Sequence, residues 1–361
     1  MGFFRRGDED DPEQAQSRER IENGGIPLEA ERRLRALTAE GALFTSGLSV
    51  NEFALLQRMG PQPVAQVMGA SVIRTGWQYL PALPPGQIVF SSGYVGNSYN
   101  NIPAGYRNRI TDASVSAVRN YTWHSAEVCE LDVLTDAWNT ARRRALDRLV
   151  EEALQVNADA VVGVRLHRGE HDLGAGTVEY MVTGTAVRLP GSTGQAWPTL
   201  TDLSVQDYWR LRSAGHEPSG LLATTTVIFA SPPLDVRFTR LRTPQQNREL
   251  EELSRGFRVA RETVRARLEG QVADAHGTGA VGVQLSHSIH RDKLALASSL
   301  QSTSRRGWQR GRLGLPYFVS GRGDAERRGW VITMHGAGTA IRPGGDPARP
   351  LIKPTIRMRS T

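Results

Sequence analysis

Two stretches of the chain place apolar residues at helical spacing. Trp138, Ala141, Ala145, Leu149 and Ala153 follow one another at steps of three or four residues. A helix over this range therefore has one apolar side. A second stripe with the same steps consists of Leu250, Leu253, Phe257, Ala260, Val264, Leu268 and Val272. The spacing predicts two long amphipathic helices, each of which covers an apolar surface.

Strand-like segments flank both predicted helices. The β-prone segments before them are 69–77 and 126–134 for the first helix and 224–230 for the second. After each helix, turn residues lead into a Val-Gly-Val strand and then into one further strand, at 177–189 and at 329–343. This order predicts an α+β fold of two tandem β-α-β-β repeats, each a long helix packed on an antiparallel-rich sheet.

Three pairs of matching segments indicate an internal duplication. The pairs are 141–166 with 260–285, 48–63 with 203–218, and 184–188 with 338–342. Their offsets are 119 (260 − 141), 155 (203 − 48) and 154 (338 − 184) residues. Offsets that change along the chain fit a duplication followed by unequal insertions.

The matched glycines of the repeated Val-Gly-Val phrase have a structural explanation. Gly163 and Gly282 lie among branched residues, where a missing side chain marks a bulge or the close approach of another backbone. We expect both glycines in buried central strands. A branched side chain at either position would then overpack the layer between helix and sheet.

The matches also divide the chain into regions. We expect a charged N-terminal tail, partly disordered or helical, a first repeat, a linker, a second repeat and a basic C-terminal tail, at 1–46, 47–191, 192–202, 203–345 and 346–361 respectively. Within the N-terminal tail, residues 17–37 are similar to a short helical oligomerisation module. The weak apolar pattern of this segment also fits a mobile tail.

The first repeat resembles a known family. A helix that ends in NADAVVGVRL at 157–166, a hairpin with the acidic residue Glu179, and GTAV at 184–187 are similar to the YbjQ-like domains, which are labelled as heavy-metal-binding. The second repeat keeps AVGVQL and GTAI but has His335 near the position aligned with Glu179. The resemblance implies a dodecin-like fold and ring-shaped homo-oligomers, pentameric in members with a single domain.

Charge, cysteine content and missing motifs exclude several classes of protein. The net charge is +7, and Lys293 and Lys353 are the two lysines among 44 basic residues. The single cysteine, Cys129, excludes an internal disulfide, and we expect it to be packed inward. The chain contains no phosphate loop, no HExxH and no GxSxG motif. With no apolar run of roughly 20 residues and no signal peptide, we expect a cytoplasmic protein without a membrane partner.

The family label directs attention to histidine as a metal ligand. His167 and His171 lie in the first predicted hairpin, and His287 and His290 lie in the matching hairpin of the second repeat. Imidazoles suit a divalent transition metal such as Zn, Cu or Ni, and Glu170 or Asp172 would complete such a site. Two exposed turn histidines in each hairpin are the alternative interpretation.

A second cluster of ligand types surrounds the cysteine. His124, Glu127, Cys129 and Glu130 are close in sequence. Because alternate residues of a strand face opposite ways, Glu127 and Cys129 share one face while His124 and Glu130 point to the other. The set is therefore split, which favours a structural role.

Three hypotheses for function remain. The leading one is a non-enzymatic, oligomeric binding or scaffold protein that holds a metal or a small ligand at subunit junctions. An alternative is an enzyme whose active site forms at an interface from His171, Glu179 or His335 of different units.

The third hypothesis is nucleic-acid binding through residues 305–328. In this segment arginines alternate with aromatic residues, namely Trp308, Tyr317 and Phe318. Because Asp324 and Glu326 partly neutralise the segment, a solvated loop is the favoured interpretation there.

Overall fold

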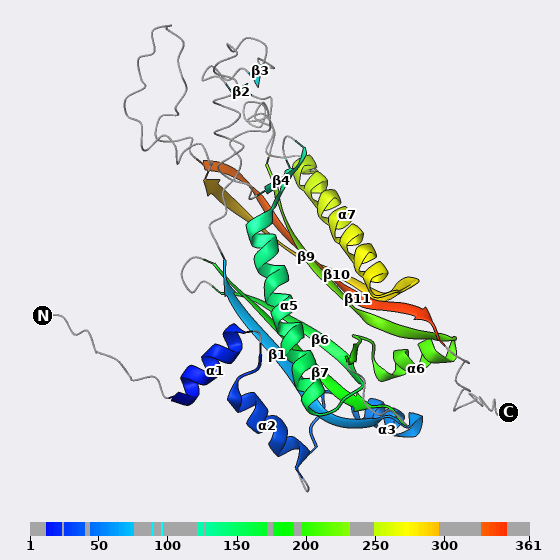
Figure 1. Cartoon of the computed structure of the whole chain (residues 1–361). Coiled ribbons are helices and arrows are strands. Elements are labelled where there is room, and N and C mark those ends of the chain that lie inside the picture. Colours follow the sequence, from blue (N-terminus) through cyan, green and yellow to red (C-terminus); the bar gives the residue numbers. More distant parts are fainter. Residues whose placement is uncertain are drawn as a thin grey trace, which may run out of the picture.

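The structure is a computed structural model, and two sheets and two long helices form its body (Figure 1). It describes residues 12–23, 25–39, 44–75, 88–89, 95–96, 121–125, 128–171, 176–190, 197–231, 249–295 and 326–344. The expected α+β fold is confirmed.

The first half of the body runs from α3 to β7. Its helices are α3 (Val50–Met59) and α5 (Asp132–Gln155), and its strands are β1 (Gln62–Arg74), β6 (Ala160–His171) and β7 (Thr177–Arg188). These strands form the first sheet in the order β1-β7-β6-β8, in which the short β8 (Thr199–Leu200) runs parallel to β6. The predicted helix at 138–153 is thus part of α5.

The second half repeats this order of elements. It contains α6 (Val205–Ser213), β9 (His216–Ala230), α7 (Glu251–Asp274), β10 (Gly279–Ala295) and β11 (Glu326–Pro343). The second sheet has the order β10-β11-β9-β5-β4. Its last two strands, β4 (Tyr121–Ser125) and β5 (Val128–Leu131), precede α5 in the chain. A short separate ladder joins β2 (Ile88–Val89) to β3 (Val95–Gly96).

The register of the strands is the same in both halves. Gly69 of β1 lies opposite Val182 of β7. Thr224 of β9 lies opposite Gly336 of β11. These positions differ by 155 (224 − 69) and 154 (336 − 182) residues, which are the offsets between the matching sequence segments. The residues that match in sequence therefore occupy matching places in the two sheets.

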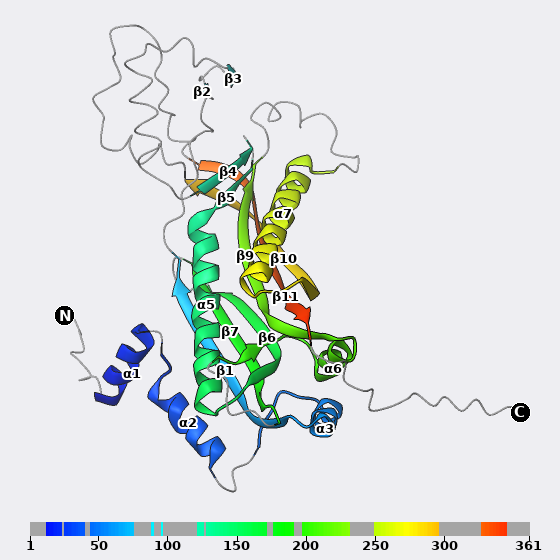
Figure 2. The same ribbon diagram turned by 45° about the vertical axis from the view of Figure 1, so that its right-hand side comes forward.

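The layers alternate between sheet and helix. One core cluster joins α5 to the first sheet and continues to Val227, Phe229 and Val331 of the second sheet. A separate cluster joins the other face of the second sheet to α7. Figure 2 shows α5 and α7 on the two sides of β9, β10 and β11. The helix of the first half is therefore packed between both sheets.

Two short helices at the N-terminal end pack against the first half. They are α1 (Pro12–Glu22) and α2 (Leu28–Thr38), and Ile26 and Leu34 are buried in the core cluster of α5. Arg33 of α2 also pairs with the buried Glu152 of α5, at 2.5 Å. Because Ile26, between the helices, and Leu34 of α2 are buried in the core cluster of α5, this N-terminal segment is part of the folded body.

The structure changes the explanation for the two matched glycines. Gly163 has φ of +62° and Gly282 has φ of +66°, and the ladder is interrupted at each of them, so the expected bulge is confirmed. The expected tight packing is wrong, since a Cβ on Gly163 would meet nothing within 4 Å and one on Gly282 would make an ordinary contact. Gly282 also lies in an exposed edge strand. At both positions glycine is required because the backbone is left-handed.

This explanation predicts unequal effects of two side chains of similar size at Gly163. We expect Gly163→Val to lower the free energy of unfolding by about 2 kcal/mol, because a branched residue is strained at positive φ. Gly163→Asn should cost clearly less, because asparagine tolerates this conformation. Urea unfolding of both variants checks this. Equal losses would instead favour overpacking.

Candidate functional site

A buried ionic cluster joins the two halves of the body. The carboxylate of Glu130, in β5, forms an ion pair with Arg267, in α7: Nη2 of Arg267 donates to Oε2 at 3.0 Å, and Nη1 lies 2.8 Å from Oε1. The hydroxyl of Thr226 donates to Glu130 at 2.6 Å, and that of Thr135 at 3.1 Å. Glu130 is 4% exposed. Such a charge is tolerated because every side of it is paired.

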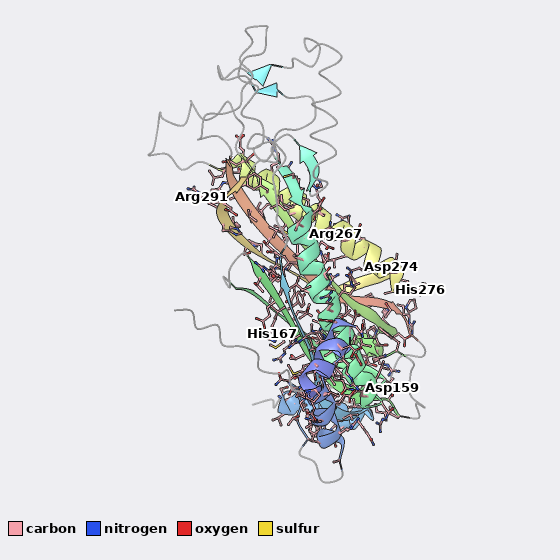
Figure 3. The ribbon with its side chains drawn as sticks, turned by 60° about the vertical axis from the view of Figure 1, so that its left-hand side comes forward. Asp159, His167, Arg267, Asp274, His276 and Arg291 are labelled. Carbon is pink, nitrogen blue, oxygen red and sulfur yellow. The ribbon has the colours of Figure 1, made fainter. Side chains whose placement is uncertain are left out.

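The same cluster caps the edge of β9. The side-chain amide of Asn139 donates to the carbonyl of Thr225 at 2.8 Å, and its oxygen accepts from the amide of Thr225 at 3.1 Å. Thr135 accepts from the amide of Val227 at 3.0 Å. Side chains of α5 thus continue the ladder that β5 begins on β9. Figure 3 labels Arg267 in the middle of the molecule.

A half-buried histidine, His335, lies beside this edge. Nδ1 of His335 is 2.8 Å from the hydroxyl of Thr225, and the His335 ring meets that of Trp138 edge to face at 5.0 Å. Burial, and to a smaller extent the positive charge of Arg168, lowers the pKa of His335 to about 3. The imidazole is therefore neutral at neutral pH and serves as a hydrogen-bond partner.

A second polar contact between the halves lies further along β11, at Thr339. The hydroxyls of Thr201 and Thr339 are 2.9 Å apart, and the amide of Asp202 donates to Thr339 at 3.2 Å. Both threonines are buried. Polar contacts therefore connect the halves at two separate places.

The side chains of this site connect the two halves and have no access to a substrate. We call Glu130, Thr135, Asn139, Thr225 and Arg267 the joint. The Thr225 hydroxyl and the His335 imidazole have the spacing of a nucleophile and a base, but Thr225 is 1% exposed, so no substrate reaches its hydroxyl. The carboxylate of Glu130 is occupied by three partners. Asp159, the aspartate of the segment NADAVVGVRL, is also buried, and its carboxylate accepts a hydrogen bond from the amide of Leu189 at 2.7 Å. These groups hold backbone and charges in place.

Of the four predicted histidine ligands, the three whose side chains the structure describes are not brought together. His167 lies on β6 opposite Met181, and its side chain is exposed (Figure 3). His287 and His290 lie within β10, three residues apart, so they point to opposite faces of an exposed strand. His171 ends β6, and its side chain is outside the described part, as are those of Glu170 and Asp172. The expected turn position is wrong for His287 and His290, because β10 continues beyond them to Ala295.

Across the described ranges, no group of three or more His, Cys, Asp or Glu side chains is arranged to hold a metal ion. In the cluster around the cysteine, His124 is exposed and Cys129 is buried, so the inward packing of Cys129 is confirmed. Glu127 lies outside the described residues.

The residues of the other two hypotheses are also separated or undescribed. His335 is in the second sheet, whereas Glu179 is in β7 of the first. Residues 305–325 of the arginine-rich segment lie outside the described ranges, and 326–328 begin β11. Among the helices that the structure describes, none is both long and apolar enough to span a membrane.

The residues of the joint were not among the predicted site residues, although one signal in the sequence pointed to them. Arg148 and Arg267 are identical residues at the offset of 119 (267 − 148). The glutamates Glu130 and Glu249 have the same offset. A charge retained in both copies on the buried side of a helix indicates a paired position.

Comparison with known families identifies the region around β5, α5, β6 and β7. A family model described as "Putative heavy-metal-binding", of the YbjQ-like type, matches residues 125–190. This range includes α5 and the repeated Val-Gly-Val phrase of the first half.

Curated relatives extend the comparison to more of the chain. The Encapsulin nanocompartment protein Rv1762c of Mycobacterium tuberculosis is 31% identical over 252 residues, which are 68% of this chain and 78% of the relative. A UPF0145 protein of Archaeoglobus fulgidus is 42% identical over 60 residues, 17% of this chain and 54% of that protein. A UPF0145 protein of Thermosipho africanus is 35% identical over 63 residues, 18% of this chain and 56% of that protein. No solved structure matches the chain.

Proposed function

The chain belongs to the family of the mycobacterial encapsulin nanocompartment protein Rv1762c, and from this premise we propose that it is a non-enzymatic scaffold that assembles from several copies. The second half is a second YbjQ-like domain, and the two domains act as one rigid building block. The name of the relative supports assembly, and the geometry of the chain supplies the physical argument.

The common register of the halves supports a second domain. Each half has a short capped helix before its first strand, with Ser49 accepting from Glu52 in α3 and Ser204 accepting from Asp207 in α6. Each long helix ends before a residue with positive φ, Asn157 at +52° and His276 at +51°. Equivalent strain at equivalent positions is typical of duplicated domains.

The use of the buried polar groups supports a role without catalysis. Glu130, Asn139 and Thr225 satisfy one another or the edge of β9. A catalytic group needs contact with a substrate, and these atoms are enclosed by protein. Their role is to fix the relative position of the halves.

The single observation that carries the proposal is the exposed apolar side of β10. Val283, Leu285 and Ile289 are 46%, 48% and 38% exposed on a strand of 17 residues at the edge of the second sheet. His287 is on the same face of β10 as these three residues, since alternate residues of a strand share a face. Its ring contacts that of Phe257 in α7, so this face of β10 lies next to α7. A long edge strand with apolar side chains is a surface that other protein covers.

Metal binding is part of the proposal only at junctions between copies. His167, His287 and His290 are each exposed but do not converge in one chain. A metal site built from these histidines and His171 therefore needs side chains from two copies.

Static light scattering tests assembly, and metal analysis of the same preparation tests the metal. We expect a mass of several chains, each of 39.6 kDa. If a metal is bound, His171→Ala with His290→Ala should lower its stoichiometry, since alanine supplies no ligand. A monomer at all concentrations would contradict the proposed scaffold. Unchanged metal in the double variant would remove these histidines as ligands.

A further inference from the structure

The packing of the two halves against each other leaves one open face on each half. Within the chain, α5 packs on the face of the second sheet that is turned away from α7, where Val227 is 1% exposed. The equivalent face of the first sheet is turned away from α5. There Val72, which corresponds to Val227 at the offset of 155 (227 − 72), is 60% exposed. We call this the receiving face.

The receiving face has the same layout as the buried one. In the second sheet Thr225 lies opposite His335, and in the first sheet their equivalents Ala70 and Met181 lie opposite each other. Ala70 and Met181 are half-buried. The N-terminal helix α1 lies near this edge, since the carbonyl of Ile21 accepts from Arg148, yet it leaves Val72 uncovered.

The second half carries the matching open surface. In the first half, Leu131 at the end of β5 and Val164 of β6 are 0% and 3% exposed, and both belong to the core cluster that surrounds α5. Their equivalents at the offset of 119 (250 − 131 and 283 − 164) are Leu250 and Val283, which are 37% and 46% exposed. Leu285 lies on the same strand. We call Leu250, which directly precedes α7, together with Val283 and Leu285 of β10 the docking face.

The charged groups of the internal joint recur beside both open faces. Arg148 donates to the carbonyl of Ala70 as Arg267 donates to that of Thr225. Ser254 donates to Glu249 as Thr135 donates to Glu130. Arg267 is paired with Glu130, whereas the buried Nε of Arg148 has no hydrogen-bond partner within the described residues. One half of such an ion pair is therefore present at each open surface, namely Arg148 at the β1 edge beside the receiving face and Glu249 next to Leu250 of the docking face.

We propose that the docking face of one copy binds the receiving face of a second copy, in the geometry by which the first half holds the second half within one chain. This inference rests on the proposed assembly and names its partner and surface. Glu249 of one copy pairs with Arg148 of the next, and Leu250, Val283 and Leu285 cover Val72 and Met181. Because the two faces differ, the contact is heterologous and joins copies head to tail in a ring or a filament.

A mixing experiment tests this head-to-tail contact. Val72→Asp places a charge on the receiving face, and Leu285→Asp places one on the docking face. We expect each variant alone to scatter as a single chain of 39.6 kDa. An equimolar mixture should give twice that mass and nothing larger. The intact docking face of the Val72→Asp chain binds the intact receiving face of the Leu285→Asp chain, and the two faces left over both carry an aspartate.

The controls separate this inference from the proposed function. Val50→Asp, at a valine of α3 that is 85% exposed, should assemble like the wild type. Circular dichroism melts should show that all variants are folded. A monomeric wild type would contradict the scaffold itself. An assembled wild type whose two interface variants also assemble would contradict only the inference.

The ion pair gives a second measurement. Glu249→Gln keeps the shape of the side chain and removes its charge, so the copy-to-copy affinity should fall by about tenfold or more. The mixture of the two aspartate variants tests the alternative of a symmetric contact. If the mixture contains only single chains although both variants are folded, the head-to-tail arrangement is wrong.

Discussion

Arg267→Ala is expected to lower the free energy of unfolding by about 3 kcal/mol, as measured by urea denaturation. The substitution leaves Glu130, which is 4% exposed, without its counter-charge. Removing one partner of a buried ion pair costs about 3–5 kcal/mol. The lower end applies because the side chain of Arg267 is 36% exposed. The loss should appear as separation of the halves, since this pair joins β5 to α7.

A matched control lies two residues away on the same helix. Arg265 pairs with Glu269, and both side chains are largely exposed, at 78% and 63%. Arg265→Ala should leave the unfolding curve unchanged, because solvent screens exposed pairs. Adding Glu130→Gln to Arg267→Ala should recover part of the loss, as the buried charge is removed. A loss as large at Arg265 as at Arg267 would contradict the assigned role of the joint.

Gly69→Ala is expected to destabilise the first half by about 3 kcal/mol, the upper end for overpacking. A Cβ at this position would overlap the carbonyl oxygen of Ala145 and lie 2.8 Å from the amide nitrogen of Leu149. Both atoms belong to the backbone of α5, so a side-chain rotation cannot relieve the clash. The helix would have to move off β1, and thermal and urea unfolding would report it.

The contrasting control is Gly270→Ala in α7. A Cβ there meets nothing within 4 Å, and alanine favours a helix interior over glycine by about 0.5–1 kcal/mol. This variant should be slightly more stable than the wild type. If both alanine substitutions proved neutral, the close contact between α5 and β1 would be disproved.

The elements of each half were predictable because they depend on local spacing. The apolar stripe from Trp138 to Ala153 lies within α5, and the stripe from Leu250 to Val272 lies within α7 apart from its first residue. The partner of the strand before α5 was not predictable. β5 adds to β9 of the second half, and an apolar strand carries no mark of the sheet that it joins.

The candidate site likewise depended on packing and not on local spacing. Histidine spacing suggested ligands, but His287 and His290 form part of one long exposed strand, and alternate residues of a strand diverge. The joint could not be located from spacing, since Glu130 and Arg267 are 137 residues apart. Only packing of α5 between the sheets brings them together.

The sequence by itself determined the α+β class, the two long helices and the matching order of the halves, because periodicity and turn residues act over a few neighbours. The tertiary structure decided which surfaces close. Val227 and Val72 occupy matching positions, yet the first is buried and the second is exposed. The physical reason is that burial depends on what packs against a face. Inside one chain α5 covers the second sheet, while the outer face of the first sheet is left open.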